Sequence, residues 1–266
     1  MNEKKVAVVT GGTSGIGRAT ALALKDAGCT VYELSRRAEG VEGLHHISAD
    51  VTDESAVNDA VAQVIAAEGQ IDILVNNAGF GISGAIEFTS TTDARSLFDV
   101  NFFGMVNMNR AVVPLMRAAG HGRIVNLSSV AAPVPIPFQA YYSATKAAVN
   151  AYTMALANEL RPFGVTVCAV MPGDIHTGFT AARRKLGEGD DIYQGRISRS
   201  VVRMEHDEQT GMDPAKAGAY ITKVALRSGS THPLYAIRFD YKFFAFLAKV
   251  LPARFLNWLI YLLYGK

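Results

Sequence analysis

Short β-branched runs alternate along this chain with longer segments whose apolar residues recur at helical spacing. This alternation is typical of a parallel sheet covered by helices on both faces. The runs are apolar throughout, as expected for strands buried on both sides. We therefore predict a single α/β domain with a doubly wound, seven-stranded parallel sheet. The predicted strands are residues 6–10, 30–34, 46–49, 71–75, 123–127, 165–171 and 234–238, and predicted helices include 16–27, 54–67, 94–117, 140–160 and 214–227.

Composition and charge exclude several other classes of protein. The 26 basic and 24 acidic residues give a net charge of +2, which provides no global attraction to nucleic acid. With 49% hydrophobic residues, the chain is too apolar to be disordered. Cys29 and Cys168 are too far apart in sequence for a disulfide framework and fit a reducing compartment. The amino terminus has no signal-peptide pattern, and the last long uncharged run, residues 255–265, is shorter than the roughly 20 residues of a spanning helix. We expect a cytoplasmic protein.

Polar and glycine residues follow the predicted strands at the points where they end. In a doubly wound sheet, the carboxyl ends of the strands lie along one edge, where ligands bind. We therefore expect these residues to converge on one site. They are the glycine-rich segment 11–17, Arg36 and Arg37, Asp50 and Val51, residues 76–79, Ser128 and Ser129, and Pro172 and Gly173.

The glycine-rich segment lies between a predicted strand and a predicted helix, and residues 10–17 read TGGTSGIG. Glycines permit positive φ and let a phosphate approach the backbone, while a helix start supplies free N–H groups and a positive dipole end. No lysine follows the last glycine, which excludes a P-loop, and the spacing differs from G-x-G-x-x-G. A tight turn without a ligand is the alternative. The strand–helix context favours a dinucleotide phosphate site.

At this loop the chain resembles the short-chain dehydrogenase/reductase family, whose pattern is T-G-x-x-x-G-x-G. Further matches follow in order along residues 4–238. They are Asn76-Asn77-Ala78-Gly79, Asn101, Ser129, Tyr142-x-x-x-Lys146, and Pro172-Gly173 with Thr177. The resemblance implies a Rossmann-type catalytic domain over residues 1–239. A substrate lid over residues 178–212 and a long carboxyl-terminal extension make the layout similar to hydroxysteroid and retinol dehydrogenases.

Tyr142 and Lys146 are four residues apart in a predicted helix, so they share one face. Tyrosine ordinarily titrates near ~10. A cation at ~4 Å, with an effective dielectric of ~20, favours the phenolate by ~4 kcal/mol, or about three pKa units. We therefore predict that Lys146 supplies much of the lowering of the Tyr142 pKa that proton exchange near neutral pH requires, with a further contribution from an oxidised nicotinamide ring. Tyr141 has no lysine four residues later, and an exposed surface pair is the alternative interpretation of Tyr142 and Lys146.

Ser129 follows the fifth predicted strand, 13 residues before Tyr142, which is the family's usual spacing. Its hydroxyl is suited to hydrogen-bond the substrate oxygen and hold it near the phenol. Ser128 is adjacent, and we assign it a structural role. These assignments place one hydrogen-bond donor beside one proton donor.

Asn101 lies inside a predicted helix, where asparagine is unfavourable because its amide competes for backbone hydrogen bonds. The resemblance implies that Asn101 takes part in a water-linked proton relay to Lys146. A surface or local-kink residue is the alternative. Asn107 and Asn109 match no family motif, and we interpret both as such residues.

These residues predict hydride transfer between a nicotinamide cofactor and a secondary alcohol or ketone, or an aldehyde. Tyr142 is the general acid and base, Ser129 polarises the carbonyl, and by resemblance Lys146 also binds the nicotinamide ribose. The six histidines show no zinc-site spacing, so no metal is predicted. The cofactor-binding residues implied are Gly11, Thr13, Ser14, Gly15, Ile16, Gly17, Arg36, Arg37, Asp50, Val51, Asn77, Ala78, Gly79, Tyr142, Lys146, Pro172, Gly173, Ile175 and Thr177.

The end of the second predicted strand distinguishes NADP(H) from NAD(H). An acidic residue there would bind the adenosine ribose hydroxyls and repel a 2′-phosphate. That position is Ser35, followed by Arg36 and Arg37, whose guanidinium groups suit a phosphate. NADP(H) is favoured, chiefly through Arg36. NAD(H) stays open, because a register shift of two residues would bring Glu33 to the ribose.

The segment from residue 181 to 211 is polar and rich in both signs of charge, which indicates a mobile lid or a plain solvated loop. Around the expected nicotinamide end lie residues 81–86, 132–138 and 178–184. The resemblance implies a substrate such as a hydroxysteroid, and acyl, terpenoid or aromatic ketones are equal alternatives. Apolar side chains in these loops indicate a small-molecule substrate that is a bulky hydrophobic alcohol or ketone. They are Ile82, Val134, Ile136, Phe138 and Phe179.

Residues 240–266 form an apolar extension in which Pro252 separates two segments of helical spacing. The segment 239–264 holds nine of the chain's 24 aromatic residues. Such helices are buried, or they contact a membrane or another protein. Packing on the chain's own domain or across a homo-oligomer, a dimer or tetramer, is favoured over contact with a membrane surface. A third alternative is that the aromatics line the substrate pocket.

Two other functions compete with the enzyme. One is a catalytically silent nucleotide-binding scaffold, because a fold alone does not imply activity. The other is a membrane-surface protein whose extension is its main functional part. The complete set of Asn101, Ser129, Tyr142 and Lys146 favours the enzyme.

Overall fold

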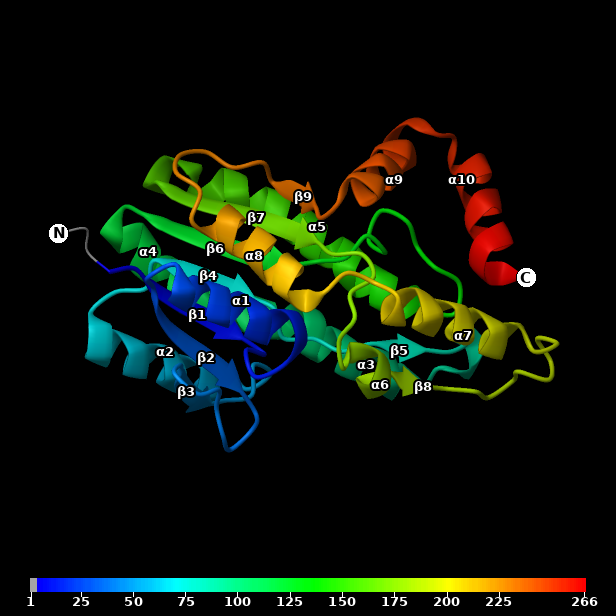
Figure 1. Ribbon diagram of the computed structural model, residues 1–266, viewed down its shortest axis with the longest axis horizontal. Helices are drawn as coiled ribbons and strands as arrows, with labels where there is room; N and C mark the ends of the chain where they lie inside the picture. Colours follow the sequence, from blue (N-terminus) through cyan, green and yellow to red (C-terminus); the bar gives the residue numbers. More distant parts are fainter. Residues whose placement is uncertain (1–3) are drawn as a thin grey trace.

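Seven parallel strands form the central sheet of the computed structural model, which describes residues 4–266 (Figure 1). The strand order is β3-β2-β1-β4-β6-β7-β9, so the order reverses between β1 and β4. This confirms the predicted doubly wound sheet, and it places the ligand crevice at the carboxyl ends of the strands. The strands are β1 (Val6–Thr10), β2 (Thr30–Ser35), β3 (His45–Ser48), β4 (Ile73–Asn76), β6 (Gly122–Leu127), β7 (Val165–Met171) and β9 (Leu234–Ala236).

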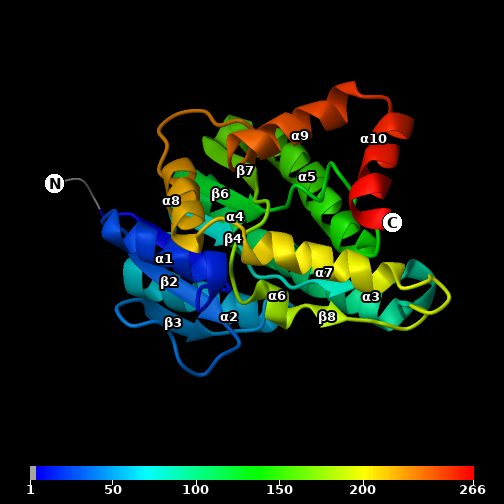
Figure 2. The ribbon, with the colours of Figure 1, turned by 45° about the vertical axis from the view of Figure 1, so that its right-hand side comes forward.

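Helices cover both faces of the sheet. On one face α1 (Gly15–Asp26) packs against α8 (Pro214–Ala225), and Gly218 permits their contact, because a Cβ there would lie 2.5 Å from the Ala19 carbonyl carbon. The other face carries α2 (Glu54–Glu68), α4 (Gly104–Ala119) and α5 (Ala140–Leu160). Figure 2 shows this arrangement turned by 45°.

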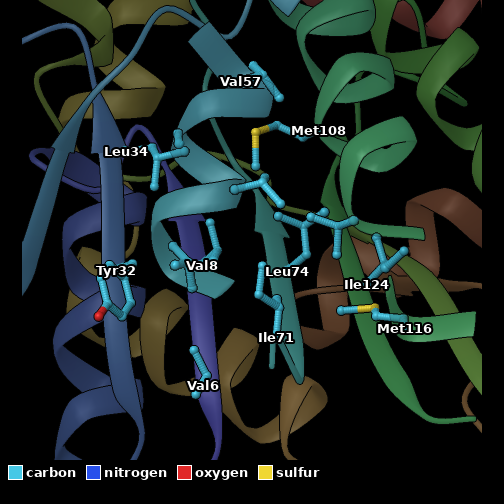
Figure 3. Close-up of a cluster of buried hydrophobic side chains, with 14 of the residues drawn as sticks. Val6, Val8, Tyr32, Leu34, Val57, Ile71, Leu74, Met108, Met116 and Ile124 are labelled. Atoms are coloured by element: carbon cyan, nitrogen blue, oxygen red, sulfur yellow. The ribbon is translucent and has the colours of Figure 1, made fainter. Parts of the chain in front are cut away.

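Along β1 and β4, successive buried side chains point to opposite faces of the sheet and belong to two different hydrophobic clusters. Val8 of β1 and Leu74 of β4 face α2 and α4, whereas their neighbours Val9 and Val75 face α1 and α8. Figure 3 shows Val8 and Leu74 in the same buried cluster as Met108 of α4. Fully burying one such side chain stabilises the fold by roughly 1.5–3 kcal/mol. Because a hydrophobic cluster lies on each face of the sheet, a central strand must present apolar side chains on both faces.

The predicted helix over residues 94–117 is wrong as one element. The structure has α3 (Thr91–Phe98), a π-helical turn η2 (Asp99–Phe103) and then α4. Ser90 begins α3 by accepting a hydrogen bond from the Asp93 amide at 3.0 Å. Asn101 lies in η2, so the wide turn occurs at the residue least suited to a regular helix.

The segment over residues 178–212 is not a plain solvated loop. It contains α6 (Phe179–Ala182), β8 (Arg184–Lys185) and α7 (Arg196–Gln209), and β8 pairs with β5 (Ile82–Ser83). The α7 helix buries Ile197, Val201 and Met204 on one stripe. Its other faces are polar, which is why the composition of the segment indicated a loop. The lid boundaries 178–212 stay a prediction.

The carboxyl-terminal segment folds as two helical pieces separated at Pro252, as predicted. They are α9 (Phe239–Val250) and α10 (Ala253–Ile260), followed by the π-helical turn η4 (Tyr261–Gly265). They lie at one end of the molecule, outside the layers that cover the sheet (Figure 1). Packing on its own domain covers only part of this segment, because no residue of α9 is fully buried. The remaining short helices are η1 (Ile86–Phe88) and η3 (Arg161–Phe163).

Across residues 4–266, every helix is too short or too polar to cross a membrane.

Candidate active site

One cavity lies at the carboxyl edge of the sheet and collects most of the predicted site residues. Six of the predicted site residues do not line it: Thr13, Gly17, Arg36, Asp50, Val51 and Asn101. The predicted residues that line it are Gly11, Ser14, Gly15, Ile16, Arg37, Asn77, Ala78, Gly79, Ser129, Tyr142, Lys146, Pro172, Gly173, Ile175 and Thr177. Residues that follow five strands, β1, β2, β4, β6 and β7, thus meet in one place, as the topology requires.

The glycine loop forms a backbone cradle at one end of the cavity. Gly11 and Gly15 have φ of 65° and 53°, which favours glycine. A Cβ on Gly17 would lie 2.3 Å from the Gly11 carbonyl oxygen, so Gly17 permits α1 to start against the loop. Ser14 precedes α1, and its side chain makes no capping hydrogen bond. The first N–H groups of α1 therefore remain available, and they fit a phosphate group.

Thr10 and Asn77 connect this loop to the end of β4. The Thr10 hydroxyl accepts hydrogen bonds of 3.0 Å from the amides of both Asn77 and Ala78. In return, Asn77 Nδ2 donates to the Thr10 carbonyl at 2.9 Å. The residue pattern 76–79 thus fixes the floor of the cavity to the glycine loop.

The reacting groups come from α5 and the end of β6. Lys146 Nζ lies 5.7 Å from the centre of the Tyr142 ring and donates a 2.8 Å hydrogen bond to the Leu127 carbonyl. The Ser129 side chain is hydrogen-bonded to the Tyr142 phenol. A carbonyl oxygen placed between the phenol and the serine hydroxyl would meet two hydrogen-bond donors.

The predicted lowering of the Tyr142 pKa by Lys146 is wrong for this structure. Burial raises the pKa of Tyr142 to about 12, although the hydrogen bond from Ser129 and the charge of Arg183 act in the opposite direction. Burial also lowers the pKa of Lys146 to about 8. Desolvation outweighs the attraction, because the ammonium group is itself buried and hydrogen-bonded to Leu127 rather than to the phenol.

Ser128 has a structural contact, because its hydroxyl donates to the Lys146 carbonyl at 3.0 Å. Asn101 is buried below the cavity, and its side chain accepts from the Phe80 amide and donates to the Phe80 carbonyl, both at 3.0 Å. It also donates to Thr145 Oγ1 at 3.3 Å. Asn101 therefore positions the chain after Gly79, and the relay to Lys146 stays a prediction.

The interpretation of Asn109 as a surface or kink residue is wrong. It is buried, and its Oδ1 accepts a 2.9 Å hydrogen bond from Asn76 at the end of β4. Asn107 donates to the Val51 carbonyl at 2.9 Å and so holds the end of β3. Nothing in the local sequence distinguished these two asparagines from solvated ones, because their hydrogen-bond partners, Asn76 and Val51, are distant in sequence.

The two arginines follow β2, the strand beside β1. Arg37 lines the cavity, whereas exposed Arg36 lies 3.9 Å from Asp50. Glu33 is fully buried, and its carboxylate is 2.5 Å from His46 Nδ1. The strand ends at Ser35, so the register shift that would present Glu33 to the cavity does not occur.

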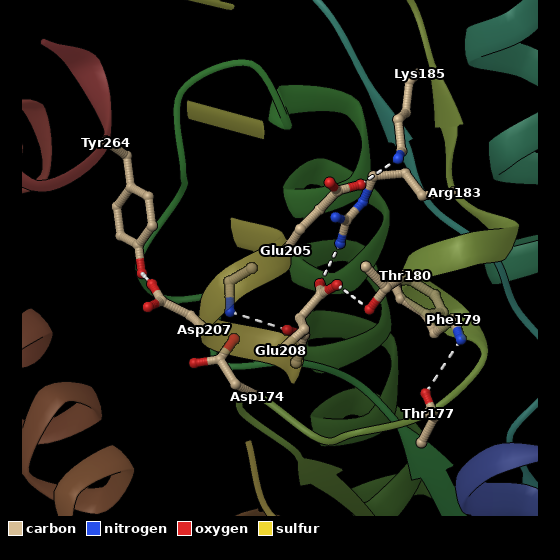
Figure 4. Close-up of polar contacts among 12 residues, drawn as sticks. Asp174, Thr177, Phe179, Thr180, Arg183, Lys185, Glu205, Asp207, Glu208 and Tyr264 are labelled. Carbon is tan, nitrogen blue, oxygen red and sulfur yellow. Dashed lines mark hydrogen bonds and ion pairs between the residues drawn. The ribbon is translucent and has the colours of Figure 1, made fainter. Parts of the chain in front are cut away.

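The lid side contributes charged residues that sequence reasoning missed. Glu208 of α7 lines the cavity and forms an ion pair with the buried Arg183, and it accepts a 2.6 Å hydrogen bond from Thr180 (Figure 4). Phe179 packs between them and the reacting tyrosine, with 5.8 Å between the Tyr142 and Phe179 ring centres. The pair fastens α7 to α6 across the cavity wall.

The predicted apolar wall is only partly present. Ile136 and Phe179 line the cavity, but Ile82, Val134 and Phe138 do not. Phe138 instead packs 5.5 Å from Tyr193 in a separate small core. The loop positions were predicted from chain order, which does not show which way a loop side chain points.

The carboxyl-terminal extension reaches the cavity through two tyrosines. The Tyr241 ring packs on Gly173, where a Cβ would lie 2.1 Å from it, and its hydroxyl donates to Asp174 at 2.7 Å. Tyr264 lines the cavity and donates to Asp207 of α7 at 3.1 Å. The predicted alternative of an aromatic pocket wall therefore holds for Tyr264.

Among residues 4–266, no three His, Cys, Asp or Glu side chains gather closely enough to hold a metal ion. Cys29 and Cys168 are both buried and free.

Known proteins resemble this chain over the same residues. The family model described as short chain dehydrogenase matches residues 5–186. A 3-ketodihydrosphingosine reductase from Bacteroides thetaiotaomicron is 41% identical over 229 residues, which cover 85% of each chain. A short-chain dehydrogenase structure from Streptomyces avermitilis has a TM-score of 0.84 at 34% identity and covers 92% of both chains. A structure of ElxO with NADP bound has a TM-score of 0.75 at 27% identity, covering 90% of this chain and 99% of that one.

Proposed function

Because the chain belongs to the short-chain dehydrogenase/reductase family, we propose that it is an NADP(H)-dependent oxidoreductase that interconverts a ketone and a secondary alcohol. The observation that carries this proposal is the convergence of Tyr142, Ser129 and Lys146 on the cavity that the glycine loop also lines. A catalytically silent scaffold would need the loop but not these three groups. The bound nicotinamide cofactor would supply the hydride.

Each residue then has one task in ketone reduction. Tyr142 donates the proton to the carbonyl oxygen, and Ser129 donates a hydrogen bond to the same oxygen. Lys146 lies close enough to the phenol to stabilise the phenolate left behind. The family resemblance implies that Lys146 also binds the nicotinamide ribose. The N–H groups at the start of α1 hold the pyrophosphate. In alcohol oxidation the same groups act in reverse.

The two arginines after β2 support NADP(H). We expect Arg36→Ala and Arg37→Ala each to weaken NADPH binding by about tenfold or more, because a hydrogen bond to a charged group contributes roughly 1.5–3 kcal/mol. NADH affinity should change little, since NADH has no 2′-phosphate. Titration followed by nicotinamide fluorescence measures both affinities.

Arg110→Ala is the matched control, because Arg110 is also exposed and ion-paired, with Glu54 at 3.1 Å, but it lies outside the cavity lining. Equal losses for NADPH and NADH in the Arg36 and Arg37 variants would contradict the preference for NADP(H).

The cavity lining and the relatives together support a ketone on a long apolar group. Ile136, Phe179 and Met204 supply apolar surface beside the reacting tyrosine, while Asp174 and Glu208 add carboxylates to the same lining. One relative is named 3-ketodihydrosphingosine reductase. This compound carries a primary amine, which the carboxylates suit, next to its ketone. It is therefore the first substrate to test.

The decisive experiment measures NADPH oxidation by the purified protein with 3-ketodihydrosphingosine. A ketosteroid, as a rigid apolar ketone without an amine, is the comparison substrate. Faster turnover of the amino ketone supports the proposal. Faster turnover of the ketosteroid would instead indicate a substrate of the hydroxysteroid class. Tight NADPH binding without turnover of any ketone would support the silent scaffold instead.

A further inference from the structure

The outer side of α9 carries a continuous apolar stripe that the rest of the chain leaves uncovered. Phe239, Phe243, Phe246 and Val250 follow one another at intervals of four, three and four residues, so they lie on one face of the helix. Their exposed fractions range from 51% to 84%. Four large side chains so exposed on one helix form a larger apolar patch than isolated surface residues do.

The second helix continues this surface. Phe255 and Trp258 of α10 are half-exposed, and their rings stack with 5.7 Å between centres. Tyr261 and Leu263 of η4 are exposed to a similar degree. We call the exposed side chains of α9, α10 and η4 the carboxyl-terminal apolar face. Its aromatic residues, tryptophan and tyrosine among them, are of the types enriched at membrane–water interfaces.

Basic residues flank this face. On the helical wheel, Lys242 and Lys249 of α9 lie together at one side of the apolar stripe, both exposed. Residues 238–266 contain a single acidic residue, Asp240, whereas the whole chain has a net charge of only +2. Positive charge is thus concentrated beside the carboxyl-terminal apolar face. The basic residues of the segment are Arg238, Lys242, Lys249, Arg254 and Lys266.

We propose that the carboxyl-terminal apolar face docks on the surface of an anionic lipid bilayer. A helix with an apolar stripe and a basic flank lies in the interface plane, with its apolar side chains among the acyl chains and its lysines at the headgroups. A second copy of the chain fits less well, because lysines are depleted from protein interfaces and those on α9 would face each other across a two-fold axis. A spanning mode is excluded for the described helices.

The same segment is joined to the cavity. Tyr241, on the inner side of α9, is hydrogen-bonded to Asp174, and Tyr264 at the end of η4 lines the cavity. Docking by the outer side would therefore hold the cavity close to the bilayer surface. If the proposed function is correct, this arrangement supplies an apolar ketone directly from the membrane, but docking itself does not depend on that activity.

The test is flotation of the full chain with vesicles of phosphatidylcholine, with or without phosphatidylglycerol. We expect binding to the anionic vesicles that weakens as salt is raised, because added ions screen the lysines. Phe246→Ser should weaken binding by roughly tenfold. Lys242→Gln/Lys249→Gln should weaken it by roughly thirtyfold on anionic vesicles only.

Matched controls keep the test specific. Phe163→Ser removes a similarly exposed phenylalanine of η3, and Lys216→Gln/Lys223→Gln removes two exposed lysines on α8. All of these variants should melt like the parent chain and bind NADPH equally. Absence of vesicle binding, or equal binding to neutral and anionic vesicles, would overturn the proposal. A lipid-independent dimer in light scattering that Phe246→Ser dissociates would overturn it too, by assigning the face to a second copy.

Discussion

Tyr142→Phe is expected to lower turnover by roughly 10³-fold while leaving NADPH affinity unchanged. General acid–base catalysis typically contributes 10²–10⁴-fold, and the substitution removes only the phenol oxygen. The aromatic ring keeps its contacts with Phe179 and Lys146, so the cavity should keep its shape. Steady-state kinetics with the best ketone substrate, together with fluorescence titration of NADPH, provide both measurements.

Tyr141→Phe is the control, because it makes the same change at the neighbouring position of α5 and has no lysine one turn later. It should retain full activity. Retained turnover in Tyr142→Phe would show that another group donates the proton.

Lys146→Met is expected to lower turnover by about a hundredfold or more and to make the folded protein more stable at neutral pH. The activity falls because the cation beside the phenol is lost. The stability rises because the parent chain buries an ammonium group, whose pKa falls from 10.5 to about 8. That shift corresponds to at most about 3 kcal/mol. Losing the hydrogen bond from this charged group to Leu127 costs roughly 1.5–3 kcal/mol, so we expect a net gain of about 1 kcal/mol.

The lowered pKa of Lys146 also predicts how the stability difference between Lys146→Met and the parent chain changes with pH. The unfolded chain binds one more proton than the folded chain between pH about 8 and 10.5, so the penalty is complete below pH 8 and disappears as the pH rises toward 10.5. The stability advantage of Lys146→Met should therefore shrink across this range. Chemical denaturation at pH 7 and pH 10 measures it, with exposed Lys223→Met as the control. A less stable Lys146→Met at pH 7 would show that the burial penalty is smaller than the contacts the lysine makes.

The sheet could be predicted from the sequence because its requirements are local. A strand covered on both faces is mostly apolar, and the central strands β1, β4 and β7 show this without reference to distant residues. The edge strand β3 is more polar and partly exposed. The positions of the glycine loop, Ser129 and Tyr142 follow from the strand order, because the carboxyl ends of parallel strands share one edge.

What could not be predicted depends on side-chain direction and on burial. In the π-helical turn, the amide side chain of Asn101 is hydrogen-bonded to the backbone of Phe80, which is 21 residues away and not recognisable as a partner from the local sequence. The helix α7 was missed because only one stripe of it is apolar. The pKa of Tyr142 was predicted in the wrong direction because the spacing of Tyr142 and Lys146 reveals their proximity but not the cost of burying both.

The contact of Tyr241 with Gly173 makes the extension and the catalytic domain mutually dependent. Any side chain larger than hydrogen at position 173 would displace the tyrosine ring, and α9 with it. Asp174, in the loop after β7, accepts a hydrogen bond from Tyr241, and Asp207 of α7 accepts one from Tyr264. A chimaera that exchanges the extension with that of a relative must therefore carry matching residues at 173, 174 and 207, although these positions lie far from residue 240 in sequence. The extension cannot be exchanged by itself, because the residues that hold it in place include positions outside residues 240–266.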